Sequence, residues 1–444
     1  MMKSYLLCVA TALFFMLACN KKEYSKTFHD PNLYRQTVKQ LNDIILDNGF
    51  SPIVASRNYA YANIAAYEVI AAGDSTNYQS LAGQIKHLPQ TPKPDVNQKI
   101  DYHFASLLAF CTVGNAVTFP EGSMDIYVDS LKQKANDEGM PSTIFENSVA
   151  YADLVAKHIL KWSKGDNYAK TRSSSKFPVR DEEGRWIPTP PMYAQALEPH
   201  WSEIRPMVLD SANQIATPAP TPFNIKDRNS QFYKNVIEVK NTVDNLSDNQ
   251  KFIADFWDDN AFKLNVNGHV MFATKKFSPG GHWMNIVGIA TKIHKEDFNT
   301  TVSIYAEASI AIFDAFIDCW YLKFKTNYVR PETAINKYID DNWKPYIQTP
   351  PFPEYTSGHA SMSAAVAEIL TDRIGDKISF RDTSQLEFGI GERTFSSFKV
   401  AAKEAGLSRV YGGIHYVTSC EQGTINGEKI GQLVLNRLHF KKQK

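Results

Sequence analysis

The feature that most constrains the fold is a long helical pattern over residues 298–328. Val302, Ile312 and Trp320 belong to an apolar stripe whose members recur every three or four positions, which is the spacing of one face of an α-helix. No series of short, alternating segments predicts a β-sheet. The same helical spacing recurs over residues 33–48, 51–72, 145–162, 231–246 and 249–262. We therefore expect an all-α protein that folds as a helical bundle.

One long segment interrupts the helical patterns. Residues 164–224 contain the sequences WIPTPP and ATPAPTP, and proline at this density favours extended, irregular chain. Such a segment either separates two domains or crosses the surface of one. We favour a long Pro-rich excursion over a single helical domain of residues 31–444. The aromatic side chains of Trp186, Tyr193 and Trp201 are expected to pack the excursion against the bundle.

The first residues have the pattern of an export signal. Lys3 precedes a mostly apolar run over residues 5–17. This run is shorter than the ~20 residues that a membrane-spanning helix needs, so residues 1–18 are expected to be a signal peptide. The sequence MLAC, which ends at Cys19, is similar to a bacterial lipoprotein signal, whose cleavage leaves a lipidated cysteine. An ordinary signal peptide followed by an incidental cysteine is the alternative.

Lipidation of Cys19 would decide where the protein resides. Several acyl chains on one cysteine hold a protein stably at a bilayer surface. Residues 19–30 are mostly polar and are expected to form a tether. We therefore expect an exported protein that is anchored to a lipid membrane through Cys19, at the periplasmic face or the outer-membrane surface of a bacterium.

Composition and charge exclude two broad classes. The chain has 444 residues, of which 43% are hydrophobic and only 21% charged, and this balance excludes a disordered protein. Lys and Arg number 48 against 47 Asp and Glu. Because the net charge is only +1, no global positive field attracts nucleic acid, and no nucleic-acid partner is expected.

Three short segments in the last third of the chain carry the residues suited to chemistry. Lys323 and Arg330 are seven residues apart, so both cations can project from one face near a helix end. Taken alone, the pair is better explained by a lysine that extends its amine to the surface and an exposed arginine. Ser357, Gly358 and His359 follow a proline-rich approach and are expected at a helix N-terminus, where free N–H groups favour an anion. The alternative is a capping serine beside an incidental histidine.

The third segment supplies another cation and another histidine. Arg409 and His415 flank the glycine pair Gly412-Gly413, which allows a tight bend, so both side chains can face a common point. Arginine can hold two oxygens of an anion at once. Together the three segments predict a site for a tetrahedral oxyanion with two or three negative charges.

The order and spacing of these segments resemble a known signature. Lys323-x6-Arg330-Pro331, Ser357-Gly358-His359 and Ser408-Arg409-x5-His415 are similar to the three-part motif of the type 2 phosphatidic acid phosphatase/vanadium haloperoxidase superfamily. The lipoprotein-like start is also similar to exported bacterial haloperoxidases of the iodoperoxidase type. The resemblance implies a helical bundle with the anion site at its core, and a catalytic core in about residues 229–444. It implies the following oxyanion-binding residues: Lys323, Arg330, Ser357, Gly358 and Arg409.

The resemblance also implies roles for both histidines. His359 would be the acid/base, and His415 the apical group that bonds the metal or attacks phosphorus. Two positions depart from the pattern: Thr356 stands where proline is usual, and Ser419 stands where His-x3-Asp expects the aspartate that orients the apical histidine. Glu421 or a backbone carbonyl would then have to replace that aspartate.

Two enzymatic reactions fit such a site, and a protein without catalytic activity is a third possibility. A haloperoxidase would bind vanadate, with His415 bonded to vanadium, and would oxidise halide with hydrogen peroxide polarised by Lys323; iodide is the halide easiest to oxidise. A phosphatase would need no cofactor and would pass through a phospho-histidine. A non-catalytic binding lipoprotein is the third reading. The chain length and the aromatic residues Trp320 and Phe352, expected to line the pocket, favour the haloperoxidase.

His282 is a further candidate for the pocket border. It follows a Pro-Gly-Gly bend at an expected helix start. A purely structural role is the alternative for this histidine.

Overall fold

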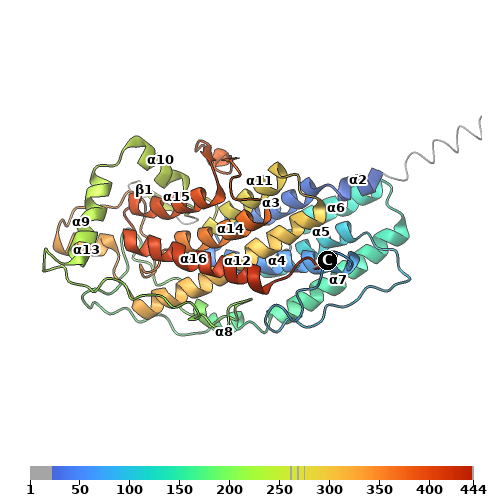
Figure 1. Ribbon diagram of the computed structural model, residues 1–444, viewed down its shortest axis with the longest axis horizontal. Coiled ribbons are helices and arrows are strands. Elements are labelled where there is room, and N and C mark those ends of the chain that lie inside the picture. Colours follow the sequence, from blue (N-terminus) through green and yellow to red (C-terminus); the bar gives the residue numbers. More distant parts are fainter. Residues whose placement is uncertain (1–22, 261–262, 268–269, 275, 443–444) are drawn as a thin grey trace, which may run out of the picture.

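The computed structural model describes residues 23–260, 263–267, 270–274 and 276–442. The predicted signal peptide, residues 1–18, and Cys19 lie outside the described residues. The described part is an elongated bundle of helices (Figure 1), which confirms the all-α prediction. In the first half of the chain the helices are α2 (Glu23–Phe28), α3 (Pro31–Asp47), α4 (Pro52–Gly73), α5 (Tyr102–Val117), α6 (Asp125–Asp137), α7 (Ser142–Ser163) and α8 (Tyr168–Thr171). In the second half they are α9 (Gln231–Asp244), α10 (Asp248–Phe256), α11 (Pro279–Ile293), α12 (Phe298–Thr326), α13 (Pro331–Tyr338), α14 (Gly358–Arg373), α15 (Phe398–Tyr411) and α16 (Val417–Arg437).

Helix α12 forms the centre of the bundle. It packs against α4 from the first half of the chain and against α14 and α16 from the second half. Apolar side chains surround the helix on almost every side, from Phe298 to Trp320, as expected for a helix buried all round. One continuous hydrophobic core reaches from Phe28 to Phe440. None of the helices in the described residues is long and apolar enough to cross a membrane.

The boundaries differ from the predictions in two places that shape the site. The helix predicted over residues 249–262 ends at Phe256, with Trp257 as its C-cap. The chain then turns at Asp259, which adopts a left-handed φ of 39° that aspartate tolerates better than most residues. The helix predicted to reach residue 328 ends at Thr326, with Asn327 left-handed. Arg330 therefore lies on the next element, as the N-cap of α13.

Short strands also occur where the sequence indicated none. Two antiparallel hairpins are present in the described residues. They pair β1 (Lys263–Asn267) with β2 (Val270–Thr274), and β3 (Phe380–Asp382) with β4 (Arg393–Phe395). Each is too short to form a sheet that could organise a fold.

The Pro-rich excursion is held against α12. Within residues 164–224 the structure has only α8 and the single 3₁₀ turn η2 (Trp201–Glu203). Trp186 and Trp201 are fully buried, as predicted. The prediction was wrong for Tyr193, which is 64% exposed at a turn with a φ of 49°. The main attachment is Asp314 of α12, whose carboxylate accepts three successive backbone N–H groups, from Met207, Val208 and Leu209, at 2.7–2.8 Å.

Part of the predicted tether is folded. Residues 23–28 form α2, and Phe28 is fully buried with its ring 4.8 Å from that of Phe104. A tether in the sense of the prediction can therefore involve only residues 19–22, which lie outside the described residues.

Helices α14 and α16 approach each other unusually closely. Gly423, Gly427 and Gly431 lie along one face of α16, against the backbone of α14. A Cβ atom at Gly423 would lie 2.7 Å from the Ser357 carbonyl oxygen, and one at Gly427 only 2.0 Å from the Ser361 carbonyl oxygen. Glycine is therefore required at these positions, and the contact fixes the start of α14.

Candidate active site

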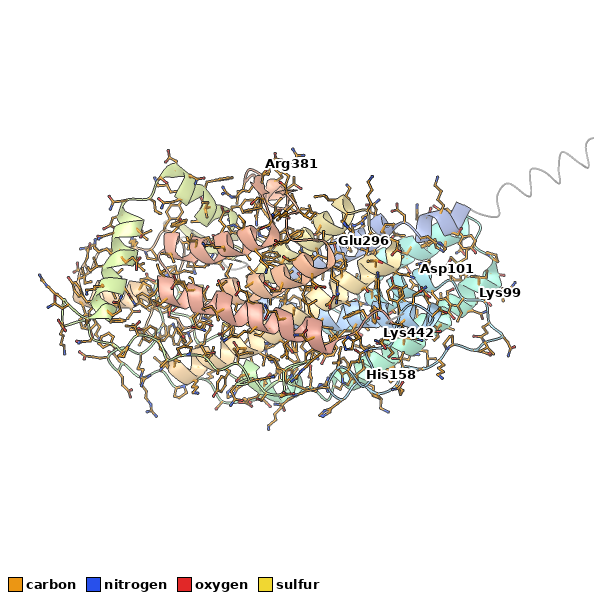
Figure 2. The ribbon with its side chains drawn as sticks, in the orientation of Figure 1. Lys99, Asp101, His158, Glu296, Arg381 and Lys442 are labelled. Atoms are coloured by element: carbon orange, nitrogen blue, oxygen red, sulfur yellow. The ribbon has the colours of Figure 1, made fainter. Side chains whose placement is uncertain are left out.

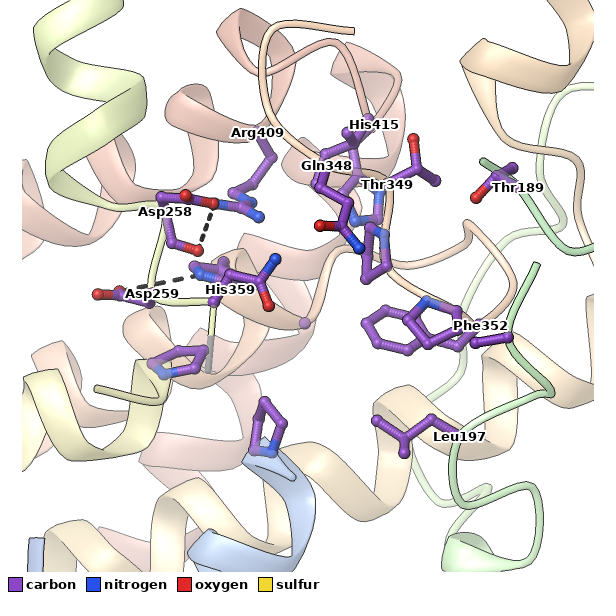
Figure 3. Close-up of a pocket in the computed structure, with 18 of the residues that line it drawn as sticks. Thr189, Leu197, Asp258, Asp259, Gln348, Thr349, Phe352, His359, Arg409 and His415 are labelled. Atoms are coloured by element: carbon purple, nitrogen blue, oxygen red, sulfur yellow. Dashed lines mark hydrogen bonds and ion pairs between the residues drawn. The ribbon is translucent and has the colours of Figure 1, made fainter. Parts of the chain in front are cut away.

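A cavity of about 260 Å³ opens where α12, α14 and α15 converge. The predicted residues Gly358, His359, Arg409 and His415 line it. Figure 3 shows His359 and Arg409 facing the same space as Phe352 and Leu197. Trp320 and Phe352, predicted to line the pocket, do so, with their ring centroids 4.9 Å apart.

The floor of the cavity is the first turn of α14. Ser357 is the N-cap, and its hydroxyl accepts the Ala360 N–H at 3.4 Å. The N–H groups of a first turn have no intrahelical partner, and together with the helix dipole they favour a negative charge. Gly358 presents its backbone directly to the cavity, and the sequence prediction of an anion-binding helix start fits this geometry.

The His415 ring is held in one tautomer by a residue that the sequence analysis did not select. Its Nδ1 atom donates to the Glu354 carboxylate at 2.7 Å. The other ring nitrogen, Nε2, therefore carries the lone pair and accepts from Arg330 Nη1 at 3.1 Å. Burial, followed by the charges of Arg330 and Lys323, holds the pKa of His415 well below its usual range. The imidazole is thus neutral, and a metal that bonds Nε2 would take over the lone pair that Arg330 Nη1 now contacts.

Glu354 is the group that replaces the missing aspartate. Its second oxygen accepts the hydroxyl of Ser419 at 2.7 Å, and its first also accepts the Tyr416 N–H at 3.0 Å. The predicted substitute, Glu421, is exposed on α16. The only sequence signal for Glu354 is a lone carboxylate in an otherwise apolar and proline-rich approach to Ser357, a place where a charge needs a partner.

Lys323 lies behind the cavity. It is fully buried, and its amine donates to the carbonyls of Pro353, Glu354 and Thr356 at 3.0, 2.9 and 2.6 Å. Burial lowers its pKa to about 8. The prediction placed this amine on the oxyanion; in this structure it fixes the loop that precedes Ser357, because three carbonyls of that loop use all three of its protons.

Buried nitrogens without partners converge on the site. Within the described residues, Arg330 Nη2, Arg409 Nε and His359 Nε2 are buried and make no hydrogen bond. The remaining contacts of these side chains are short: Arg330 donates to the Phe352 and Ile414 carbonyls at 3.0 and 2.8 Å, and Arg409 to the Trp257 carbonyl at 2.7 Å. A buried, unsatisfied polar group costs about 1–3 kcal/mol. An oxyanion bound here would accept from the two arginine nitrogens, so the residues present fit such a group.

His282 contacts Asp259, a residue that lines the cavity, but does not line the cavity itself. It is fully buried. Its Nδ1 lies 3.0 Å from Asp259 and its Nε2 lies 2.9 Å from Asp382. Burial alone would lower its pKa, but the two carboxylates raise it to about 10, so the ring is charged.

Asp259 connects the charged His282 ring to the cavity. It lines the cavity, and its Oδ2 lies 3.9 Å from His359 Nε2. The pKa of His359 is held well below its usual range by burial, then by Arg409 and His282. His359 is therefore a neutral base, and its buried Nε2 lies beside a carboxylate that can stabilise the protonated ring.

The family model described as the VCPO second helical-bundle domain matches residues 303–443. A comparison with curated proteins gives no match. Two crystal structures of a bacterial vanadium-dependent chloroperoxidase, in holo and apo form, share 18% identity with TM-scores of 0.64 and 0.66, over 88% of this chain and 94% of that chain. At this identity they support the fold alone.

A third structure is much more similar. The crystal structure of a bacterial vanadium-dependent iodoperoxidase shares 43% identity with a TM-score of 0.88, over 94% of this chain and 98% of that chain. Similarity at this level over nearly the full length extends to both the fold and the segments that form the cavity. The chain belongs to the vanadium-dependent haloperoxidase family.

Proposed function

We propose that the halide of this vanadium-dependent haloperoxidase is iodide. Membership of the family gives the chain vanadate as cofactor, with hydrogen peroxide and a halide as substrates. The observation that supports iodide is the 43% identity to a bacterial iodoperoxidase over nearly the whole chain. Iodide also needs the least oxidising power of the halides, so it is the substrate that any enzyme of this class can use most easily.

We further propose which residues hold vanadate. Arg330 and Arg409 would balance its negative charge through the nitrogens that now lack partners, and the first turn of α14, at Ser357 and Gly358, would bind its oxygens. His415 would bond vanadium through Nε2. When bound, vanadate supplies a Lewis-acidic centre that activates hydrogen peroxide toward attack by halide.

The remaining residues move protons and exclude water. His359 Nε2 can take a proton from hydrogen peroxide as it enters, and Asp259 stabilises the charge that the ring gains. Lys323 contributes by fixing the loop of Glu354 and Thr356 rather than by touching the peroxide. The rings of Trp320 and Phe352 form an apolar wall, which suits a large, polarizable halide better than a strongly hydrated one.

The activity test uses the mature protein without its lipid, freed of bound anions. Adding orthovanadate should give iodide oxidation by hydrogen peroxide, phosphate should compete with vanadate, and His415→Ala should reduce turnover to background. Exposed Glu421→Gln is the matched control and should behave as wild type. Bromide oxidised as efficiently as iodide would overturn the iodide proposal. Phosphomonoester hydrolysis without vanadate-dependent oxidation would favour the phosphatase reading.

We also propose that the protein is exported and anchored by lipid at Cys19. The support is the sequence of residues 1–19, in which an apolar run ends at MLAC. Expressed in a bacterium, the full chain should label with a radioactive fatty acid and sediment with membranes. The variant Cys19→Ala should do neither, while Cys111→Ala, which changes a buried cysteine, should leave both unchanged. Membrane association that survives Cys19→Ala would contradict the proposal.

A further inference from the structure

A second cluster of ligand-type side chains lies near the start of the described chain, toward the opposite end of the bundle from α10 and α13 (Figure 1). His29 follows α2, Asp101 is the N-cap of α5, and His103 lies in the first turn of α5. Figure 2 labels Asp101 at this end of the molecule. One ligand atom from each residue lies within 4.8 Å of the other two.

The spacing matches the requirements of a small cation. His29 Nε2 and Asp101 Oδ2 are 3.4 Å apart. Two ligands bonded at about 2.0–2.1 Å to a tetrahedral zinc ion lie about 3.3–3.4 Å from each other, so this edge of a tetrahedron already has the right length. His103 completes the set with a ring centroid 4.0 Å from that of His29.

Asp101 and His103 are each oriented by a second contact. Asp101 Oδ1 accepts the Phe104 N–H at 2.9 Å, which leaves Oδ2 for the cluster. His103 Nε2 lies 3.0 Å from the Asn299 side-chain oxygen, which can only accept. The proton is therefore on Nε2, and Nδ1 carries the lone pair. A histidine ligand whose other nitrogen donates to an oxygen is the usual arrangement in metal sites.

We propose that His29, Asp101 and His103 bind one divalent ion of the zinc type. Two imidazoles and a carboxylate are ligands that zinc prefers. His29 has a side chain that is 48% exposed, so solvent can supply the fourth ligand. The ion would fasten the chain at His29, between α2 and α3, to the N-termini of α5 and α12, since Asn299 belongs to α12.

Zinc titration of the whole mature protein tests the proposal. After treatment with a chelator, calorimetry with Zn²⁺ alone should show one saturable site. His29→Gln and His103→Gln should weaken it strongly, and Asn299→Leu, which removes only the orienting contact, should weaken it about 10- to 100-fold. His158→Gln and His415→Ala should leave it unchanged, which separates this site from other histidines and from the vanadate site. Zinc affinity that is unchanged in His29→Gln, His103→Gln and Asn299→Leu would overturn the proposal.

Two further measurements, hydrogen exchange and Co²⁺ absorption, test the site in the wild-type protein without any substitution. Zn²⁺ should slow amide hydrogen exchange in α2, because the ion would tie His29 to the bundle. Co²⁺ should replace it and give the intense visible absorption of a four-coordinate ion. Absence of a saturable Zn²⁺ site in the wild-type protein would show that His29 and Asp101 form an ion pair only.

Discussion

Replacing Glu354 with glutamine should reduce vanadate affinity or turnover by about 10- to 100-fold, the usual loss when a partner of a metal-ligating histidine is changed. The glutamine oxygen can still accept from His415 Nδ1 and from the Tyr416 N–H, and its amide can donate to the Ser419 hydroxyl. The tautomer is therefore kept. What is lost is the negative charge that makes the His415 ring a better ligand and that faces Arg330 and Lys323.

The measurement is vanadate titration of the apo protein, followed by halide oxidation at saturating vanadate. Glu421→Gln is the matched control, since Glu421 is an exposed glutamate on α16. Ser419→Ala should cost less than Glu354→Gln, because it removes one hydrogen bond and no charge. Wild-type vanadate affinity and turnover in Glu354→Gln would show that the carboxylate is structural only.

The second large effect concerns stability. Gly427→Ala should lower the free energy of unfolding by about 1–3 kcal/mol, the usual cost of overpacking a tight contact. Alanine is favoured over glycine by about 1 kcal/mol within a helix, so propensity alone predicts stabilisation. The clash dominates because the new Cβ would lie 2.0 Å from the Ser361 carbonyl oxygen, and a backbone atom cannot rotate away as a side chain can.

Thermal and urea unfolding monitored by circular dichroism would measure this change. Gln432→Ala, at an exposed position of the same helix, is the control and should be neutral. An unfolding midpoint equal to or above that of the wild type in Gly427→Ala would mean that α14 and α16 can separate at no cost. That result would contradict the close approach on which the position of Ser357 depends.

Much of the fold was predictable because helices are encoded locally. The periodicity over residues 298–328, the proline at the start of α4 and the capping role of Ser357 each involve residues a few positions apart. The segments predicted to bind the oxyanion could be recognised for the same reason. In contrast, no periodicity reveals that the chain leaves α10 at Trp257 and takes a left-handed turn at Asp259.

The partners of the catalytic groups were not predictable from the sequence. Glu354 and His415 are 61 positions apart, and Asp382 is 100 positions from His282, so their pairing exists only once the helices pack. The carbonyl partners of Lys323 were not predictable for a related reason. They come from a loop whose path is set by tertiary structure, and a carbonyl has no signature in the amino-acid sequence.

The attachment of the excursion to α12 separates two parts of the cavity wall. The residues proposed to hold vanadate lie on α14, on the loop before α13 and around the end of α15, whereas Met192, Gln195 and Leu197 of the opposite wall belong to the excursion. Leu197 is held through its backbone: its N–H donates to the Pro351 carbonyl at 2.9 Å, and its carbonyl accepts from Trp320 Nε1 of α12 at 3.1 Å. Substitutions between residues 189 and 197 are therefore expected to change which molecules can enter the cavity without moving the residues proposed to hold vanadate.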